Sequence, residues 1–102
     1  SFTAKILTLG SVRLDQEEQE LVAGNSIRLS SRETKLLAYF MLNPAKKLTT
    51  EHLFKTIWDD EEDVDESIVW VYISYLRQKL QAIQADISIL GEKGGDFCLL
   101  TN

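Results

Sequence analysis

The sequence has little cysteine, histidine or proline, and it contains no long apolar run. Cys98 is the only cysteine and His52 the only histidine, which excludes an intramolecular disulfide and a Cys/His zinc cluster. Uninterrupted apolar stretches are only a few residues long, and no basic region precedes any of them. We therefore expect no membrane span, no secretory signal and a location in the cytoplasm.

Motifs of catalysis are also lacking. The lone histidine has no serine or cysteine partner at a recognisable spacing, and no phosphate-cradling glycine motif occurs. Most carboxylates that stand close together belong to a single segment. We expect neither an enzyme nor a cofactor or metal site.

The composition is that of one small globular domain. Its 102 residues are 44% hydrophobic and 26% charged, which suffices for one core and leaves no room for a second domain. The net charge is −5, and residues 59–66 hold seven acids and no base. The rest of the surface is nearly neutral or mildly basic, so overall charge does not exclude a DNA partner.

Short β-favouring runs fill the first thirty residues, and turn signals such as Gly10-Ser11 and Gly24-Asn25 separate them. They predict a four-stranded antiparallel meander. The runs are Ile6 to Leu9, Val12 to Leu14, Glu20 to Val22 and Ser26 to Leu29.

Three helices are predicted after the meander. Ser30 or Ser31 offers an N-cap for the first helix, which stops at Asn43-Pro44 because proline disfavours the helical conformation before it. The second helix opens at Thr49 or Thr50. The third begins between Val64 and Ser67, where clustered acids meet the positive end of its dipole. Its core stripe has helical spacing and consists of Val69, Ile73, Leu76, Leu80 and Ile83.

The last two β-favouring runs, Ile87 to Leu90 and Phe97 to Leu100, flank a glycine-rich segment and predict a β-hairpin. Four strands, three helices and a hairpin make an α+β winged helix-turn-helix. This scaffold binds DNA more often than anything else, although the fold alone does not establish a function.

Five motifs at fixed separations give the chain a family resemblance. With them the sequence resembles the C-terminal output domains of OmpR/PhoB-type response regulators over nearly its whole length. The motifs are Arg32-Glu33-Thr34-Lys35-Leu36-Leu37, Asn43-Pro44, Thr49-Thr50-Glu51-His52-Leu53, Ile57-Trp58 and Val69-Trp70-Val71-Tyr72-Ile73-Ser74-Tyr75-Leu76-Arg77-Gln78-Lys79-Leu80.

The resemblance implies the effector domain of a two-component response regulator, a transcriptional regulator that binds double-stranded DNA. It implies that the third helix enters the major groove and that the wing reaches the adjacent minor groove. It also implies that the loop between helices two and three faces RNA polymerase or a sigma factor. Residues 1–102 then form a single output domain, excised from a longer chain with an N-terminal receiver domain and dimeric in that context.

Nine residues are candidates for DNA contact. Serine and glutamine side chains suit base edges, aromatic side chains suit thymine methyl groups, and basic side chains suit phosphates and the narrow minor groove. Backbone N–H groups at the start of the second helix suit a phosphate. The candidates are Ser67, Trp70, Ser74, Tyr75, Arg77, Gln78, Lys93, Thr50 and Trp58.

Several candidates also have structural interpretations. Arg77 is one of only two basic residues on the third helix, and it either touches phosphate or lies beside a carboxylate. Trp58 is either a backbone contact or a core aromatic that anchors the loop. Trp70 lies about 100° from the core stripe, next to an expected solvent face, where an exposed indole would require a partner. Arg32 and Lys35 are interpreted as ordinary surface charges.

The acidic segment leaves two functions open. Its residues form either a solvated loop that favours the start of the third helix, or a surface that attracts a basic protein partner. The alternative to DNA binding is therefore a winged-helix scaffold used as a protein-interaction module, with Trp70, Tyr75 and this loop as its contact surface. The loop residues are Asp59, Asp60, Glu61, Glu62 and Asp63.

Overall fold

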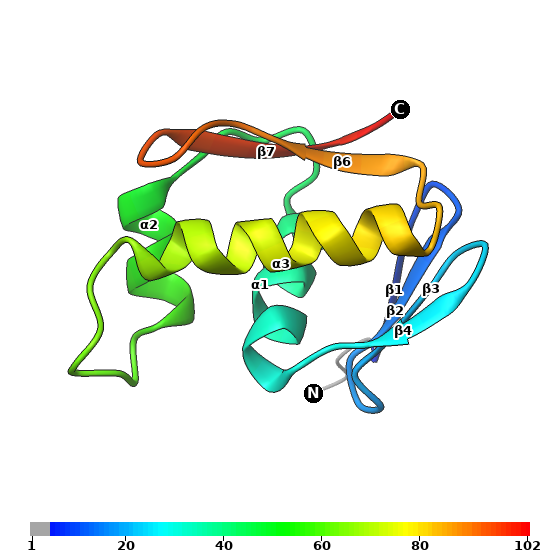
Figure 1. Cartoon of the computed structure of the whole chain (residues 1–102), viewed down its shortest axis with the longest axis horizontal. Helices are drawn as coiled ribbons and strands as arrows, with labels where there is room; N and C mark the ends of the chain where they lie inside the picture. Colours follow the sequence, from blue (N-terminus) through cyan, green and yellow to red (C-terminus); the bar gives the residue numbers. More distant parts are fainter. Residues whose placement is uncertain (1–4) are drawn as a thin grey trace.

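The computed structural model describes residues 5–102 and places three helices beside two small antiparallel sheets (Figure 1). One sheet lies near the C-terminal end of the longest helix, and the other runs along the side of that helix. The elements are β1 Ile6–Leu9, β2 Val12–Asp15, β3 Glu20–Val22, β4 Ser26–Arg28, α1 Ser31–Leu42, β5 Leu48–Thr49, α2 Thr50–Ile57, α3 Ile68–Ala82, β6 Ile87–Leu90 and β7 Asp96–Thr101.

The N-terminal sheet is the predicted meander, with strand order β1-β2-β3-β4. Leu14 of β2 pairs with Leu21 of β3, and both are completely buried while their neighbours in sequence are more exposed. The alternation of apolar and polar residues thus fixes which face of the sheet covers the helices.

Side-chain caps set the starts of the first two helices. Ser30 and Glu33 form a reciprocal capping box, in which Ser30 Oγ accepts from the Glu33 N–H and Glu33 Oε1 accepts from the Ser30 N–H. The helix ends at Leu42, with Asn43 as its C-cap residue just before Pro44. Thr49 caps α2 through the His52 N–H at 3.0 Å.

The core lies between α3, α1 and the two sheets. All five residues of the predicted stripe are at most 3% exposed; Val69, Ile73, Leu76 and Leu80 lie in α3, and Ile83 is its C-cap residue. The fold class, a winged helix-turn-helix with an N-terminal four-stranded sheet, is confirmed as well. Among residues 5–102, no helix is long and apolar enough to cross a membrane.

The wing, formed by β6, β7 and the segment 91–95 that joins them (the wing tip), contains a third strand that was not predicted from the sequence. β5 pairs with β7 through Leu48 opposite Phe97 and Thr49 opposite Asp96, giving a sheet of order β5-β7-β6. Thr49 also caps α2, so the start of α2 is joined directly to the wing.

Candidate nucleic-acid interface

The N-terminal end of α3 is held by Asp65, near the end of the preceding loop. Asp65 Oδ1 accepts a hydrogen bond from the Ser67 N–H at 2.8 Å and another from the Ser67 hydroxyl. Both bonds lower the pKa of Asp65, and the bond from the Ser67 hydroxyl is the larger cause. The helix therefore begins at Ile68, with Ser67 exposed at its entrance.

The exposed face of α3 is formed by uncharged side chains. Tyr75 is 46% exposed and Val71 37% exposed, and Gln78 is exposed beside them. Ser74 is half-buried, and its hydroxyl donates to the Trp70 carbonyl one turn earlier at 2.9 Å. Tyr75 and Gln78 thus offer hydroxyl and amide groups to a partner, whereas the Ser74 proton is used within the helix.

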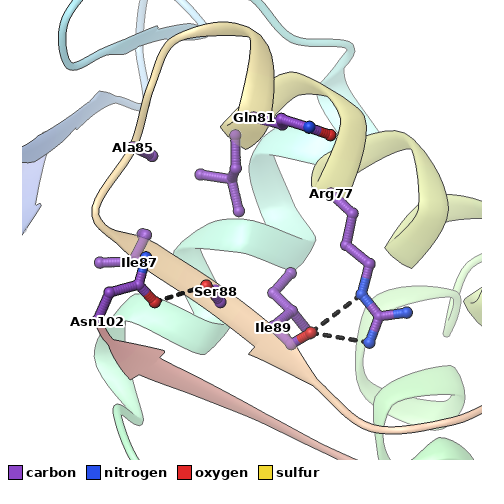
Figure 2. Close-up of a pocket in the computed structure, with 8 residues that line it drawn as sticks. Arg77, Gln81, Ala85, Ile87, Ser88, Ile89 and Asn102 are labelled. Carbon is purple, nitrogen blue, oxygen red and sulfur yellow. Dashed lines mark hydrogen bonds between the residues drawn. The ribbon is translucent and has the colours of Figure 1, made fainter.

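Both cations of α3 form hydrogen bonds inside the domain. Arg77 Nε and Nη2 donate to the Ile89 carbonyl of β6 at 3.0 and 2.8 Å (Figure 2), and Nη2 also donates to the Gly91 carbonyl at 2.7 Å. Lys79 Nζ lies 2.8 Å from Glu33 Oε1 and donates to the Arg28 carbonyl at 3.0 Å. Neither interpretation of Arg77 from sequence included these backbone acceptors on the wing.

Trp70 packs between α3 and the wing instead of standing free in solvent. Its ring stacks on Phe97 of β7 with centroids 6.2 Å apart, and the Arg77 guanidinium carbon lies 5.3 Å from the ring centroid. The indole is half-buried. The indole thus has an internal partner next to the solvent face, because β7 passes close enough to cover one ring face.

A small cavity brings four of the nine candidate residues together. Its volume is about 200 Å³, and it lies where the starts of α2 and α3 meet the wing tip. The Thr50 hydroxyl is buried and donates to the Gly95 carbonyl at 2.6 Å, while Lys93 is exposed. The cavity is lined by Thr50, Ser67, Trp70 and Lys93 together with Glu66 and Gly94.

Trp58 belongs to a row of aromatic rings between α2 and α3. It is only 4% exposed, stacks near Phe54 and meets the edge of Tyr72, whose ring in turn contacts Tyr75. The structural interpretation, a buried aromatic that anchors the loop, therefore describes its packing.

The acidic loop is tied to α1 by two basic residues. Arg32 binds Asp60 at 3.0 Å and Glu61 at 3.1 Å, and Lys35 binds Asp59 at 3.3 Å. The hydrogen bond from Arg32 lowers the pKa of Asp60. Arg32 also donates to the Ile57 carbonyl and lies over the Trp58 ring.

This arrangement corrects the interpretation of Arg32 and Lys35 as ordinary surface charges. Their partners lie 24 to 29 residues further along the chain, and no local pattern indicates a contact over that separation. Glu62 and Asp63 are exposed and form no ion pair within the part of the chain that the structure describes.

Three cations close to the wing sheet remain available to an anionic partner. Lys46, Lys47 and Lys93 are exposed and form no ion pair within residues 5–102. Lys93 stands at the wing tip, and the two others precede β5 and lie beside β7, where the Ala45 N–H donates to the Leu99 carbonyl. Among the same residues, no group of three or more His, Cys, Asp or Glu side chains is arranged to hold a metal ion.

Comparison with known proteins identifies a family model that covers most of the chain. The model described as "Transcriptional regulatory protein, C terminal" matches residues 24–95. The transcriptional regulatory protein DltR of Streptococcus agalactiae serotype III is 33% identical over 97 residues, which are 94% of this chain and 43% of that protein. The heme response regulator HssR of Staphylococcus aureus strain JH9 is 32% identical over 92 residues, 89% of this chain and 41% of that protein.

Solved structures show the same fold. The C-terminal domain of the nisin resistance regulator NsrR, a lantibiotic response regulator, superposes with a TM-score of 0.79 at 26% identity, covering 94% of this chain and 98% of that domain. The chain spans less than half the length of the curated relatives that it matches.

Proposed function

Because the chain belongs to the family of transcriptional regulatory protein C-terminal domains, the OmpR/PhoB type, we propose that it binds double-stranded DNA as the output domain of a two-component response regulator. In this proposal residues 1–102 are one domain of a longer cytoplasmic regulator that carries a receiver domain and acts as a dimer. No catalytic step is part of it.

The observation that carries the proposal is the convergence of α3 and the wing tip. Ser67 at the entrance of α3 and Lys93 at the wing tip line one cavity, so a duplex that enters beside α3 also meets the wing. Tyr75 and Gln78, exposed further along α3, are the side chains we assign to base edges in the major groove. Lys93 is assigned to the edge of the adjacent minor groove, where it neutralises a phosphate.

Five further candidates have supporting roles in this proposal. Trp70, Ser74, Arg77, Thr50 and Trp58 all make contacts within the domain, and we assign them to the shape of the interface rather than to hydrogen bonds with bases. The start of α2, at Thr50, keeps its place beside the DNA backbone because it is joined to the wing.

Selection from a pool of randomised duplexes tests the proposal. The wild-type chain is mixed with the pool at low salt, bound duplexes are enriched over several rounds, and affinities are measured by fluorescence anisotropy. We expect one sequence class to be enriched and to bind at least tenfold more tightly than the starting pool, as specific sites do. Failure to enrich any duplex refutes DNA binding by this domain.

Matched substitutions assign the contact face in the same assay. Gln78→Ala is expected to relax the selected sequence at one or two base pairs, since a base-edge contact specifies sequence. Lys93→Gln is expected to weaken binding to all duplexes alike. The control is Arg13→Gln, which removes an exposed cation of β2 in the N-terminal sheet.

A protein partner is the second candidate function, because α3 uses both of its cations internally. The exposed Tyr75 ring and the fixed acidic loop then form a surface for a basic protein, such as a polymerase subunit or sigma factor. Salt-sensitive binding of purified RNA polymerase that is lost in a Glu62→Lys, Asp63→Lys variant supports this function. Polymerase binding that the variant retains rejects the acidic loop as the contact.

A further inference from the structure

Arg77 holds the outer strand of the wing. β6 is the edge strand of its sheet, and the bond from the Asn102 N–H to the Asp86 carbonyl fixes which of its residues face β7. By the alternation of an antiparallel ladder, Ile89 points its carbonyl to the free edge. Arg77 supplies that carbonyl with two donors and thereby gives the edge strand the partner that no strand provides.

The Arg77 guanidinium also contacts Gly91, the first residue after β6. This residue has φ +133°, and a Cβ there would lie 2.2 Å from the Asp96 carbonyl oxygen and 2.7 Å from the Phe97 ring. Gly91 therefore lies too close to Asp96 and Phe97 to carry a side chain. The bond from Arg77 Nη2 to the Gly91 carbonyl fixes Gly91 relative to α3.

Trp70 holds the second strand of the wing from the same helix. Its ring stacks on Phe97 of β7 and lies against the Arg77 guanidinium. Two side chains of α3 thus contact both wing strands: Arg77 forms hydrogen bonds with β6, and the Trp70 ring packs on β7. The two side chains also contact each other.

The rest of the wing tip follows directly after Gly91, which Arg77 contacts. Lys93 is two residues after Gly91, is exposed, and lines the cavity that Ser67 and Trp70 also line. From this geometry we propose that Arg77 is a positioning residue, which sets Lys93 against the DNA-facing surface of α3 and does not itself bind phosphate. The inference rests on the proposed function, since the tip matters only if DNA is bound there.

The chemistry of the contact predicts that lysine cannot replace Arg77. A guanidinium is a planar fork that donates to Ile89 and Gly91 while its face lies on Trp70, whereas an ammonium group is a compact point charge. A phosphate contact made through charge would survive Arg77→Lys. A positioning contact would not.

The first experiment needs no DNA. Amide hydrogen exchange is measured for Gly95 and Thr50, whose N–H groups donate to the Glu92 and Gly95 carbonyls in the wing tip. We expect at least tenfold faster exchange at both amides in Arg77→Lys than in wild type, and no change in the control Arg13→Lys. Equal exchange in a folded Arg77→Lys variant overturns the proposal.

A measurement on the wild-type chain keeps the test independent of variant folding. The Nε–H resonance of Arg77 is expected to be protected from exchange with water, and to keep its chemical shift when a selected duplex is added. A shift on DNA binding as large as that of the Lys93 resonances means that Arg77 touches the DNA, and it overturns the proposal.

A double-mutant cycle on salt dependence completes the test. The slope of log K against log salt is negative, and it becomes less negative by about 0.9 for each phosphate that the protein no longer neutralises. We expect the slope to become less negative by about 0.9 in Arg77→Lys and in Lys93→Gln. The double variant should show the same change of about 0.9, because the phosphate that loses its cation is the same one in all three variants. A reduction of about 1.8 in the double variant, or an unchanged slope in Arg77→Lys, overturns the proposal.

The cycle also separates this inference from the proposed function. A wild-type chain that binds no duplex at any salt concentration refutes the proposed function, and with it any role of the tip in DNA contact. A wild-type chain that binds, with additive slopes in the variants, refutes only the positioning role of Arg77.

Discussion

Lys79 Nζ lies 2.8 Å from Oε1 of Glu33, whose side chain is only 5% exposed. The same carboxylate oxygen accepts the Ser30 N–H that caps α1, so one buried group joins α3 to the start of α1 across 46 residues of sequence. A buried carboxylate requires such partners, because burying an unpaired charge is costly.

Lys79→Met is therefore expected to lower the free energy of unfolding by about 1–3 kcal/mol, since methionine keeps the packing of the stem but leaves Glu33 without its counter-charge. Urea unfolding measures the change. Lys55→Met is the control, because its pair with Glu51 is exposed on both sides, at 3.6 Å, and its removal should cost less than about 0.5 kcal/mol. Equal destabilisation of the two variants would show that the Glu33 pair does not stabilise the fold.

Trp70→Ala should reduce both stability and wing order. The ring packs on Phe97, so its removal opens space beside β7, and we expect a decrease of about 1–3 kcal/mol in the free energy of unfolding. Tyr75→Ala removes a ring that is 46% exposed and is expected to cost less. If Trp70→Ala kept full stability but no longer bound a partner, Trp70 would be a contact residue for that partner, as the interaction-module hypothesis requires.

Acid is expected to loosen the contact between the N-terminal sheet and the turn before β6. The Ser11 N–H donates to both carboxylate oxygens of Asp86, at 2.9 and 3.1 Å, and this holds the pKa of Asp86 below its usual value. A carboxyl whose pKa is lower in the folded than in the unfolded state adds stability above its unfolded pKa, and that stability disappears as the pH falls.

Asp86→Asn should therefore be less stable than wild type at pH 7. The difference should shrink as the pH falls below about 4, the usual pKa of an aspartate carboxyl, and should disappear only below the lowered pKa of folded Asp86. Urea midpoints at a series of pH values measure the difference. Glu62→Gln, at an exposed loop position without an ion pair in residues 5–102, should not show this convergence. A gap between wild type and Asp86→Asn that is constant from about pH 7 to about pH 3 would contradict the linkage.

The elements of the fold were predictable from sequence because local patterns specify them. The buried stripe of α3 follows from apolar spacing, and the caps at Ser30 and Thr49 follow from residue type. β5 was missed because two residues, Leu48 and Thr49, carry no period of their own and become a strand only by pairing with β7.

The candidate site was less predictable, because long polar side chains choose their partners in three dimensions. Helical periodicity places Arg77 and Lys79 away from the core stripe, but it does not say that they reach β6 and Glu33 instead of solvent. The attachment of Arg32 to the acidic loop spans 28 and 29 residues, and it depends on how α1 packs beside α2. Such contacts follow from the assembled fold and have no local sequence signal.

The engagement of the α3 cations has a measurable consequence for DNA binding. Each neutralised phosphate contributes a slope of about −0.9 to log K against log salt. With Lys46, Lys47 and Lys93 as the free cations beside the wing in the described residues, a single domain on a single half-site should show a slope of roughly −3 or shallower, whereas phosphate contacts from Arg77 and Lys79 in addition would give about −4.5. Fluorescence anisotropy on a selected half-site duplex measures this slope.

Two variants test which lysines meet phosphates. Lys47→Gln should make the slope less negative if Lys47 meets a phosphate. Lys79→Met should leave the slope unchanged, because Lys79 is held by Glu33. A smaller slope in Lys79→Met would mean that DNA draws this lysine away from its buried partner, so that binding and the α1–α3 contact compete for one side chain.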